Sequence, residues 1–226
     1  MKKLAMTSLA CLGILMGGHS LAQATPLIQN GSFESGASAA PFQTLNAGDN
    51  ALSGWTVNAR SIDWINGYWP AFDGTKSLDM AGFHAHGTIS QSFTTVAGQS
   101  YLVTFDLAGN PDRTYNKELI ASAGDGLAPS VASTIVTQTD IFNQSGHSFG
   151  SMGWTPEALQ FTATSNNSWI SFADSTPGIP GEENAFSFGA ALDNVNVAPV
   201  PEPGTMMLLG AGFLGLAVFG KRRKNA

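Results

Sequence analysis

Short segments in which apolar and polar residues alternate are the feature that most restricts how this chain of 226 residues can fold. Residues 100–108 and 159–163 alternate in this way, and the last such run, 186–197, would place Ala191 and Asp193 on one face. Alternation is typical of strands with one buried side, because successive strand side chains point to opposite faces. Turn-forming residues separate about nine or ten such segments, and no long stripe of period 3.6 is present. The pattern predicts an all-β domain built as a two-sheet sandwich or jelly roll.

The first 24 residues have the composition of a secretory signal peptide. Lys2 and Lys3 form a short basic start, and an apolar stretch follows over residues 4–16. Ala22 and Ala24 place small residues at the two positions that a signal peptidase must accommodate. We therefore expect signal peptidase to cleave after Ala24 and the remainder of the chain to be exported.

The other end of the sequence predicts a membrane segment. Pro201, Glu202 and Pro203 lie in a linker at 199–204, an uncharged apolar run follows at 205–220, and a basic tail occupies 221–226. Sixteen helical residues rise roughly 24 Å at about 1.5 Å each, slightly less than a bilayer core usually requires. The positive-inside rule leaves the basic tail in the cytoplasm and the preceding domain outside.

These three parts, in this order, resemble the PEP-CTERM sorting signal of Gram-negative bacteria. The resemblance covers residues 201–226 and implies that an exosortase recognises the tail and acts near Pro201–Pro203. It also implies anchoring in the inner membrane before sorting, then residence at the cell surface or in the extracellular matrix. Proteins with this signal usually accompany exopolysaccharide production in biofilms.

The composition of the exported part limits its partners. Between residues 25 and 200 the chain has four basic residues against fifteen acidic ones, whereas the whole chain has a net charge of −6. Nucleic acid is therefore an unlikely ligand, since its binding depends on Lys and Arg at the phosphates. The single cysteine, Cys11, belongs to the signal peptide. The mature domain can thus form neither a disulfide nor a thiolate metal site.

The domain at 25–198 resembles the choice-of-anchor C family of bacterial surface proteins. The resemblance rests on the opening segment 27–34 (LIQNGSFE), on 54–57, 61–65 and 73–80, and on the closing segment 191–195 (ALDNV). It implies a galactose-binding-like jelly roll, and it brings no general ligand or activity.

Carbohydrate-binding jelly rolls similar to this one often hold a structural Ca²⁺ between a Glu after the first strand and an Asp in the last strand. The matching residues here are Glu34 and Asp193. Ca²⁺ requires six to eight oxygen ligands, so two carboxylates with backbone carbonyls would begin such a site. The alternative is that both carboxylates cap turns or accept backbone N–H groups.

A cluster of aromatic residues predicts a sugar-binding platform. Trp64, Tyr68 and Trp69 could stack on the apolar face of a sugar ring, while Asp63 and Asp73 could bind its hydroxyl groups. Tyr68 and Trp69 lie in a segment bounded by Gly and Pro, which indicates a loop. The alternative for Trp64, and for Trp55 before it, is a place in the sandwich core.

Other candidates for chemistry are weaker. His84 and His86 would share one face of an extended segment as a metal pair, but nearby glycines indicate a loop, and His147 stands alone. The sequence contains no nucleophile elbow, no HExxH motif and no phosphate-binding glycine loop. We therefore predict a non-enzymatic surface protein that binds extracellular polysaccharide. The alternatives are a structural or adhesive module that binds proteins, and a polysaccharide-modifying enzyme.

Overall fold

The computed structural model describes residues 26–83, 85–178, 181, 186–201, 204, 210–212 and 214. The predicted signal peptide, His84, Glu202, Pro203 and most of the predicted membrane segment lie outside these residues. Within the described part of the chain, no helix has the length and apolar character needed to cross a membrane.

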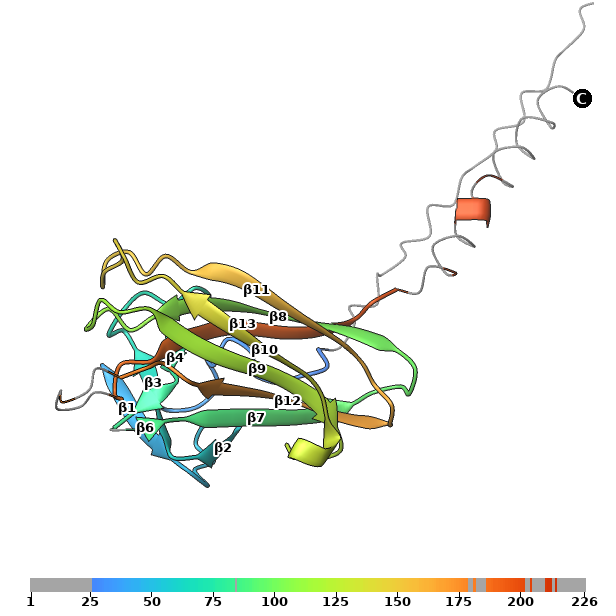
Figure 1. Cartoon of the computed structure of the whole chain (residues 1–226), viewed down its shortest axis with the longest axis horizontal. Helices are drawn as coiled ribbons and strands as arrows, with labels where there is room; N and C mark the ends of the chain where they lie inside the picture. The colour runs from blue at the N-terminus through green and yellow to red at the C-terminus, as the bar shows by residue number, and fades with distance from the viewer. Residues whose placement is uncertain are drawn as a thin grey trace, which may run out of the picture.

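Two antiparallel sheets pack face to face, as the alternation predicts (Figure 1). The six-stranded sheet has the order β1 (Phe42–Asn46), β3 (Ser61–Asn66), β4 (Lys76–Asp79), β13 (Ala190–Pro199), β8 (Ser100–Gly109), β11 (Thr155–Thr162). The five-stranded sheet has the order β10 (Thr134–Phe142), β9 (Lys117–Asp125), β12 (Asn167–Asp174), β7 (Thr88–Thr94), β2 (Thr56–Ala59). A small hairpin of β5 (Ala81–Gly82) and β6 (Ala85–His86) and a 3-10 turn, η1 (Val131–Ser133), complete the fold. The prediction of an all-β jelly-roll sandwich is confirmed.

Strand β8 shows why these residues form a sandwich. Its residues Tyr101, Val103, Phe105 and Leu107 are buried and point between the sheets, where Phe105 meets Phe172 of β12 at 5.1 Å between ring centroids. Leu102 and Thr104, on the other side of β8, are half-buried. Burial of one face of each strand stabilises the pair of sheets, because each buried aromatic or aliphatic side chain contributes about 1.5–3 kcal/mol.

Strand β13 departs from the predicted alternation. Its register with β8 shifts between Asp193 and Asn196, and Asn194 has a positive φ of 50°. This bulge adds a residue to one strand. As a result Leu192, and not Asp193, lies on the same inner face as Val197. The strand also starts at Ala190 and not at residue 186.

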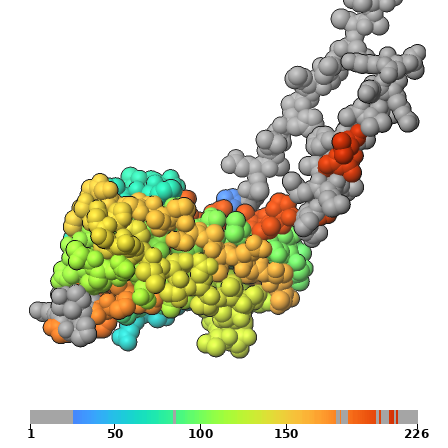
Figure 2. Space-filling model, turned by 45° about the horizontal axis from the view of Figure 1, so that its top comes forward, coloured from blue at the N-terminus to red at the C-terminus, as the bar shows by residue number. Residues whose placement is uncertain are grey.

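The two ends of β13 lie at opposite ends of the molecule. In Figures 1 and 2 the chain leaves the sandwich where β13 finishes, while the segment that precedes β13 lies at the other end. Ala191, near its start, pairs with Asp79 of β4, and Pro199, at its finish, pairs with Tyr101 of β8.

Candidate functional site

A cavity of about 250 Å³ lies on the outer face of the six-stranded sheet, over β1, β3 and β4. Side chains of these strands form its floor, and the loops that follow β3, β5 and β8, with the segment before β13, form its walls. The lining residues are Phe42, Thr44, Asp63, Ile65, Tyr68, Trp69, Asp79, Phe83, Asn110, Asp112, Ser187 and Phe188. The cavity therefore combines aromatic rings with carboxylates.

The floor is a row of polar side chains in register across three strands. Thr44 pairs with Asp63, and Asp63 pairs with Asp79, so all three side chains point to the same face. The Thr44 hydroxyl donates to Oδ1 of Asp63 at 2.5 Å. Oδ2 of Asp63 has no hydrogen-bond partner among the described residues, and burial raises the pKa of Asp63. Asp63 thus keeps one carboxylate oxygen for a ligand.

Asp79 is bound by the protein itself. Its Oδ1 accepts the backbone N–H groups of Ala81 and Gly189, at 3.0 and 3.1 Å, and its Oδ2 accepts the Asn110 side chain at 2.6 Å. Asp79 is 1% exposed, and burial raises its pKa well above the usual value despite these donors. Asp79 therefore fixes the cavity wall and has little surface for a ligand.

Tyr68 provides one of the accessible aromatic walls of the cavity. Its hydroxyl donates to Oδ2 of Asp112 at 3.0 Å, and its ring meets Phe42 and Phe149 edge-on at 5.6 and 5.1 Å. Burial raises the pKa of Tyr68, and the neighbouring Asp112 carboxylate adds to the rise. These contacts hold a half-buried ring in one orientation, as a stacking surface requires.

The structure brings together three of the five predicted ligand-binding residues: Asp63, Tyr68 and Trp69 line the cavity. Trp69 contributes only part of its surface, since it is 2% exposed and its indole N–H donates to Ser77. Asp73 lies on an exposed loop and is not among the residues that line the cavity.

The placement of Trp64 in a sugar platform is corrected. Trp64 is 0% exposed and faces the core, where its indole N–H donates to the carbonyl of Phe33 at 3.0 Å. It follows Asp63 directly in β3, so the two side chains must point to opposite faces. Trp55 is likewise in the core, at 3% exposed.

Glu34 and Asp193 bind backbone amides in this structure. Glu34 accepts the N–H groups of Thr75 and Lys76 at 2.7 and 2.6 Å, and Asp193 accepts those of Phe72 and Asp73 at 2.8 and 3.0 Å. Oδ1 of Asp193 accepts a further N–H from Asn194. As placed, these two residues do not fit a calcium site, because backbone N–H groups and the Thr75 hydroxyl already donate to the carboxylate oxygens that a cation would need. They instead hold the 72–76 loop from two sides.

The ammonium group of Lys76 is hydrogen-bonded to two backbone carbonyl oxygens in the segment that contains Glu34. Nζ of Lys76 donates to the carbonyls of Glu34 and Gly36 at 3.0 and 2.8 Å and lies 4.8 Å from the ring centre of Trp64. This cation ties the 34–36 segment to the start of β4.

We expect Lys76→Met to lower the free energy of unfolding by about 1–2 kcal/mol, because it leaves two carbonyls without a donor. Methionine has an unbranched side chain of similar length, so the loss of stability would measure the contribution of the ammonium group. Urea unfolding of both proteins measures it, with Lys76→Arg as the charge-retaining control. Equal midpoints for the Met variant and the unaltered protein would show that the ammonium contributes nothing.

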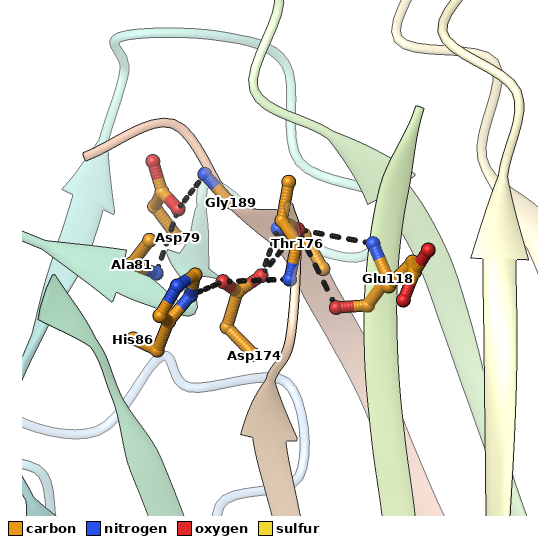
Figure 3. A network of polar contacts seen from close by, with 8 residues as sticks. Asp79, Ala81, His86, Glu118, Asp174, Thr176 and Gly189 are labelled. Atoms are coloured by element: carbon orange, nitrogen blue, oxygen red, sulfur yellow. Dashed lines mark hydrogen bonds and ion pairs between the residues drawn. The ribbon is translucent and has the colours of Figure 1, made fainter. Parts of the chain in front are cut away.

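A network of polar groups lies close to Asp79, one of the cavity residues (Figure 3). Asp174 accepts from Thr176 and from the backbone of Ala190, and it is paired with Nδ1 of His86. Thr176 in turn contacts the backbone of Glu118. The network ties the β5–β6 hairpin and the start of β13 to the five-stranded sheet.

No metal role emerges for His86 from this arrangement. The described residues contain no group of three or more His, Cys, Asp or Glu placed to hold a metal ion. Its predicted partner, His84, lies outside the described residues. His147 is within 5.1 Å of the Phe142 ring, centre to centre.

One buried cation accompanies these acids. Lys117 is 0% exposed, and burial lowers its pKa to about 8, although attraction to Asp79 and Asp174 opposes the change. Its Nζ lies 3.7 Å from the centre of the Tyr115 ring. Lys117 therefore offsets part of the negative charge of Asp79 and Asp174.

Several cavity residues were not predicted from the sequence. Phe42, Asp79, Asn110, Asp112 and Phe188 come from five separate segments. Only the spacing of Asp63 and Asp79 in two predicted neighbouring strands could have indicated a shared face. The rest depends on contacts between distant loops.

A second groove of about 250 Å³ lies on the outer face of the five-stranded sheet. Thr56 and Ser90 in its floor begin a row of hydroxyl side chains that continues in register across the sheet through Ser171, Ser122 and Thr137. Its lining residues include neither a charged nor an aromatic side chain among those described. This groove therefore lacks the stacking ring that the first cavity has.

The fold and the cavity define a jelly-roll sandwich module with a ligand-sized hollow on one sheet face. The chain belongs to the DUF642 family, described as a protein of unknown function, which matches residues 26–198. The PEP-CTERM protein-sorting motif matches residues 199–224, so the chain carries a signal for export and membrane-associated sorting to the surface. The finer resemblance to the choice-of-anchor C family stays a prediction.

One curated relative is Halomucin of Haloquadratum walsbyi, which is 30% identical over 196 residues. The match covers 84% of this chain but only 2% of Halomucin, so the chain spans a small fraction of that protein.

Two solved carbohydrate-binding modules are among the structures to which this chain is similar. The CBM22-1 xylan-binding domain of Paenibacillus barcinonensis Xyn10C has a TM-score of 0.46 and 11% identity, covering 74% of this chain and 99% of its own. TmCBM61, solved with β-1,4-galactotriose, has a TM-score of 0.43 and 12% identity, covering 78% of this chain and 100% of its own. The likeness describes the sandwich architecture only.

Proposed function

We propose that this protein is an exosortase-sorted surface protein that binds an extracellular polysaccharide in the cavity over β1, β3 and β4. The observation that carries the proposal is the pairing, in one cavity, of an oriented, half-buried Tyr68 ring with an Oδ2 of Asp63 to which no described residue donates. A sugar ring presents an apolar C–H face and hydroxyl donors, and the cavity offers a surface for each. The sorting motif supports an extracellular ligand.

The two carboxylates in the cavity floor favour binding over catalysis. Glycoside hydrolysis requires two carboxyl groups that both reach the bond to be cleaved. Of the two carboxylates side by side in the floor, Asp79 is almost wholly buried and accepts three N–H groups of the protein. That leaves Asp63 as the floor carboxylate that a ligand can reach, while Asp112 in the wall accepts the Tyr68 hydroxyl. We extend the proposal to exopolysaccharide of the producing organism's biofilm, on the strength of the sorting signal.

Binding is expected to depend on the Tyr68 ring. Tyr68→Ala should weaken binding of oligosaccharide hits from a glycan array about 5- to 30-fold, since a stacking ring contributes on the order of 1–2 kcal/mol. Titration calorimetry on the full chain in detergent micelles measures the change.

Two variants control this experiment. Tyr68→Phe keeps the ring and loses only the hydrogen bond to Asp112, so most affinity should remain. Phe72→Ala removes a ring that is 51% exposed but does not line the cavity, and affinity should not change. A glycan array without any hit at millimolar sugar would reject polysaccharide binding.

A further inference from the structure

The walls of the cavity have the composition of a cation-binding site. Its lining includes three carboxylates, Asp63, Asp79 and Asp112, and five aromatic rings. No Lys, Arg or His lines it within the part of the chain that the structure describes. Aromatic faces and carboxylates both attract cations, the faces through the negative charge above the ring.

One wall already holds a cation of the protein. The Arg113 guanidinium lies 4.3 Å from the ring centre of Phe188, and its Nη1 donates to the carbonyl of Asp112 at 2.9 Å. The Phe188 ring and the backbone carbonyl of Asp112, both from residues that line the cavity, thus bind a positive charge of the protein itself. Arg113 itself is not among the residues that line the cavity.

The floor carboxylate is only partly compensated. Asp63 has a single hydrogen bond among the described residues, from the neutral Thr44 hydroxyl. Burial disfavours its charged form, as the raised pKa indicates. A ligand ammonium would relieve this cost, whereas a ligand carboxylate or sulfate would add to it.

We infer that the ligand presents an ammonium group beside an apolar carbohydrate face, as the amino sugars of a partly N-deacetylated polysaccharide do. The inference rests on the proposed function and names the class of sugar. The ammonium would bind between Asp63 and the Tyr68 ring, while the C–H face of the sugar packs on the aromatic walls. The excess of acidic over basic residues in the exported domain would also attract a polycationic chain.

Oligosaccharides of equal length and different charge test this inference. The full chain in detergent micelles is titrated with tetramers of β-1,4-linked glucosamine, of β-1,4-linked N-acetylglucosamine and of α-1,4-linked galacturonic acid, at about pH 6 so that the amine is protonated. The glucosamine tetramer is expected to bind at least tenfold more tightly than the acetylated one, as a charge-assisted contact implies. Added salt should reduce this difference.

Substitutions assign the preference to the cavity. Asp63→Asn should remove most of the difference between the two tetramers, with the same melting temperature as a check on folding. Asp112→Asn, in the wall that holds the Tyr68 hydroxyl, is a second test and should also reduce the difference. Asp73→Asn is the matched control, because it removes an exposed carboxylate outside the cavity, and the difference should persist.

The outcomes separate the inference from the proposed function. Equal affinity for the glucosamine and N-acetylglucosamine tetramers, or preference for the galacturonate, overturns the inference and leaves polysaccharide binding intact. Choline or ethanolamine binding as tightly as the glucosamine tetramer overturns the assignment to a sugar. Absence of binding by every tetramer and every array glycan rejects the proposed function and the inference with it.

Discussion

Trp64→Ala is expected to cost about 3–5 kcal/mol of unfolding free energy, the range for removing a large buried aromatic side chain. The ring is wholly buried, its N–H satisfies the Phe33 carbonyl, and Lys76 lies over its face. Removing it leaves a cavity, an orphaned carbonyl and an ammonium without its ring. The melting temperature should fall on the order of 10 °C for a domain of this size.

Thermal and urea unfolding of the variant measure this effect. Trp64→Phe restores most of the buried area without the N–H and should lose clearly less. Phe72→Ala removes a ring that is 51% exposed and should leave the melt unchanged. If Trp64→Ala had the same melting temperature as the unaltered protein and lost only sugar binding, Trp64 would belong to the ligand site. Its assignment to the core would then be wrong.

The second large effect is a loss of stability as pH rises from about 4 to about 7. Asp193 is 0% exposed, and burial raises its pKa from 3.8 to about 7 in spite of three backbone N–H donors. In this range the native state retains a proton that the unfolded state has released. Stability therefore falls with increasing pH and levels off above 7, by on the order of a few kcal/mol. Burial raises the pKa of Asp79 as well, which acts in the same direction.

Urea unfolding at a series of pH values measures this slope, and Asp193→Asn should make it flatter. The same experiment tests the calcium hypothesis. A bound cation would favour the carboxylate, lower the pKa of Asp193 and make the protein less stable toward acid. We expect a chelator to leave the melting temperature unchanged. A chelator-sensitive melt with greater stability at neutral pH would restore Glu34 and Asp193 as calcium ligands.

Much of the fold follows from local patterns in the sequence. The alternation in β8 predicts which residues face the core, because a strand repeats every two residues. The same rule failed in β13, because the bulge at Asn194 interrupts the alternation. Val197 therefore shares a face with Leu192 and not with Asp193. A bulge depends on hydrogen bonds to neighbouring strands, and a pattern within one segment does not contain them.

The site was only partly predictable for a related reason. Asp63 and Trp64 are adjacent in one strand, so strand geometry alone excludes a site that uses both side chains. Tyr68 was predicted from its loop context, and it does line the cavity. Asp112 and Phe188 reach the same cavity from loops distant in the sequence, and only the packing of the two sheets brings them there.

The course of β13 determines how the cavity would be presented at a surface. From Ala191, beside the cavity floor, to Pro199, where the chain departs toward its sorting signal, the strand extends roughly 26 Å. A hydrogen-bonded central strand is stiff along its length, so it acts as a spacer between attachment point and binding site. A chain held by its tail would therefore carry the cavity floor at the end of β13 that lies far from the attachment point.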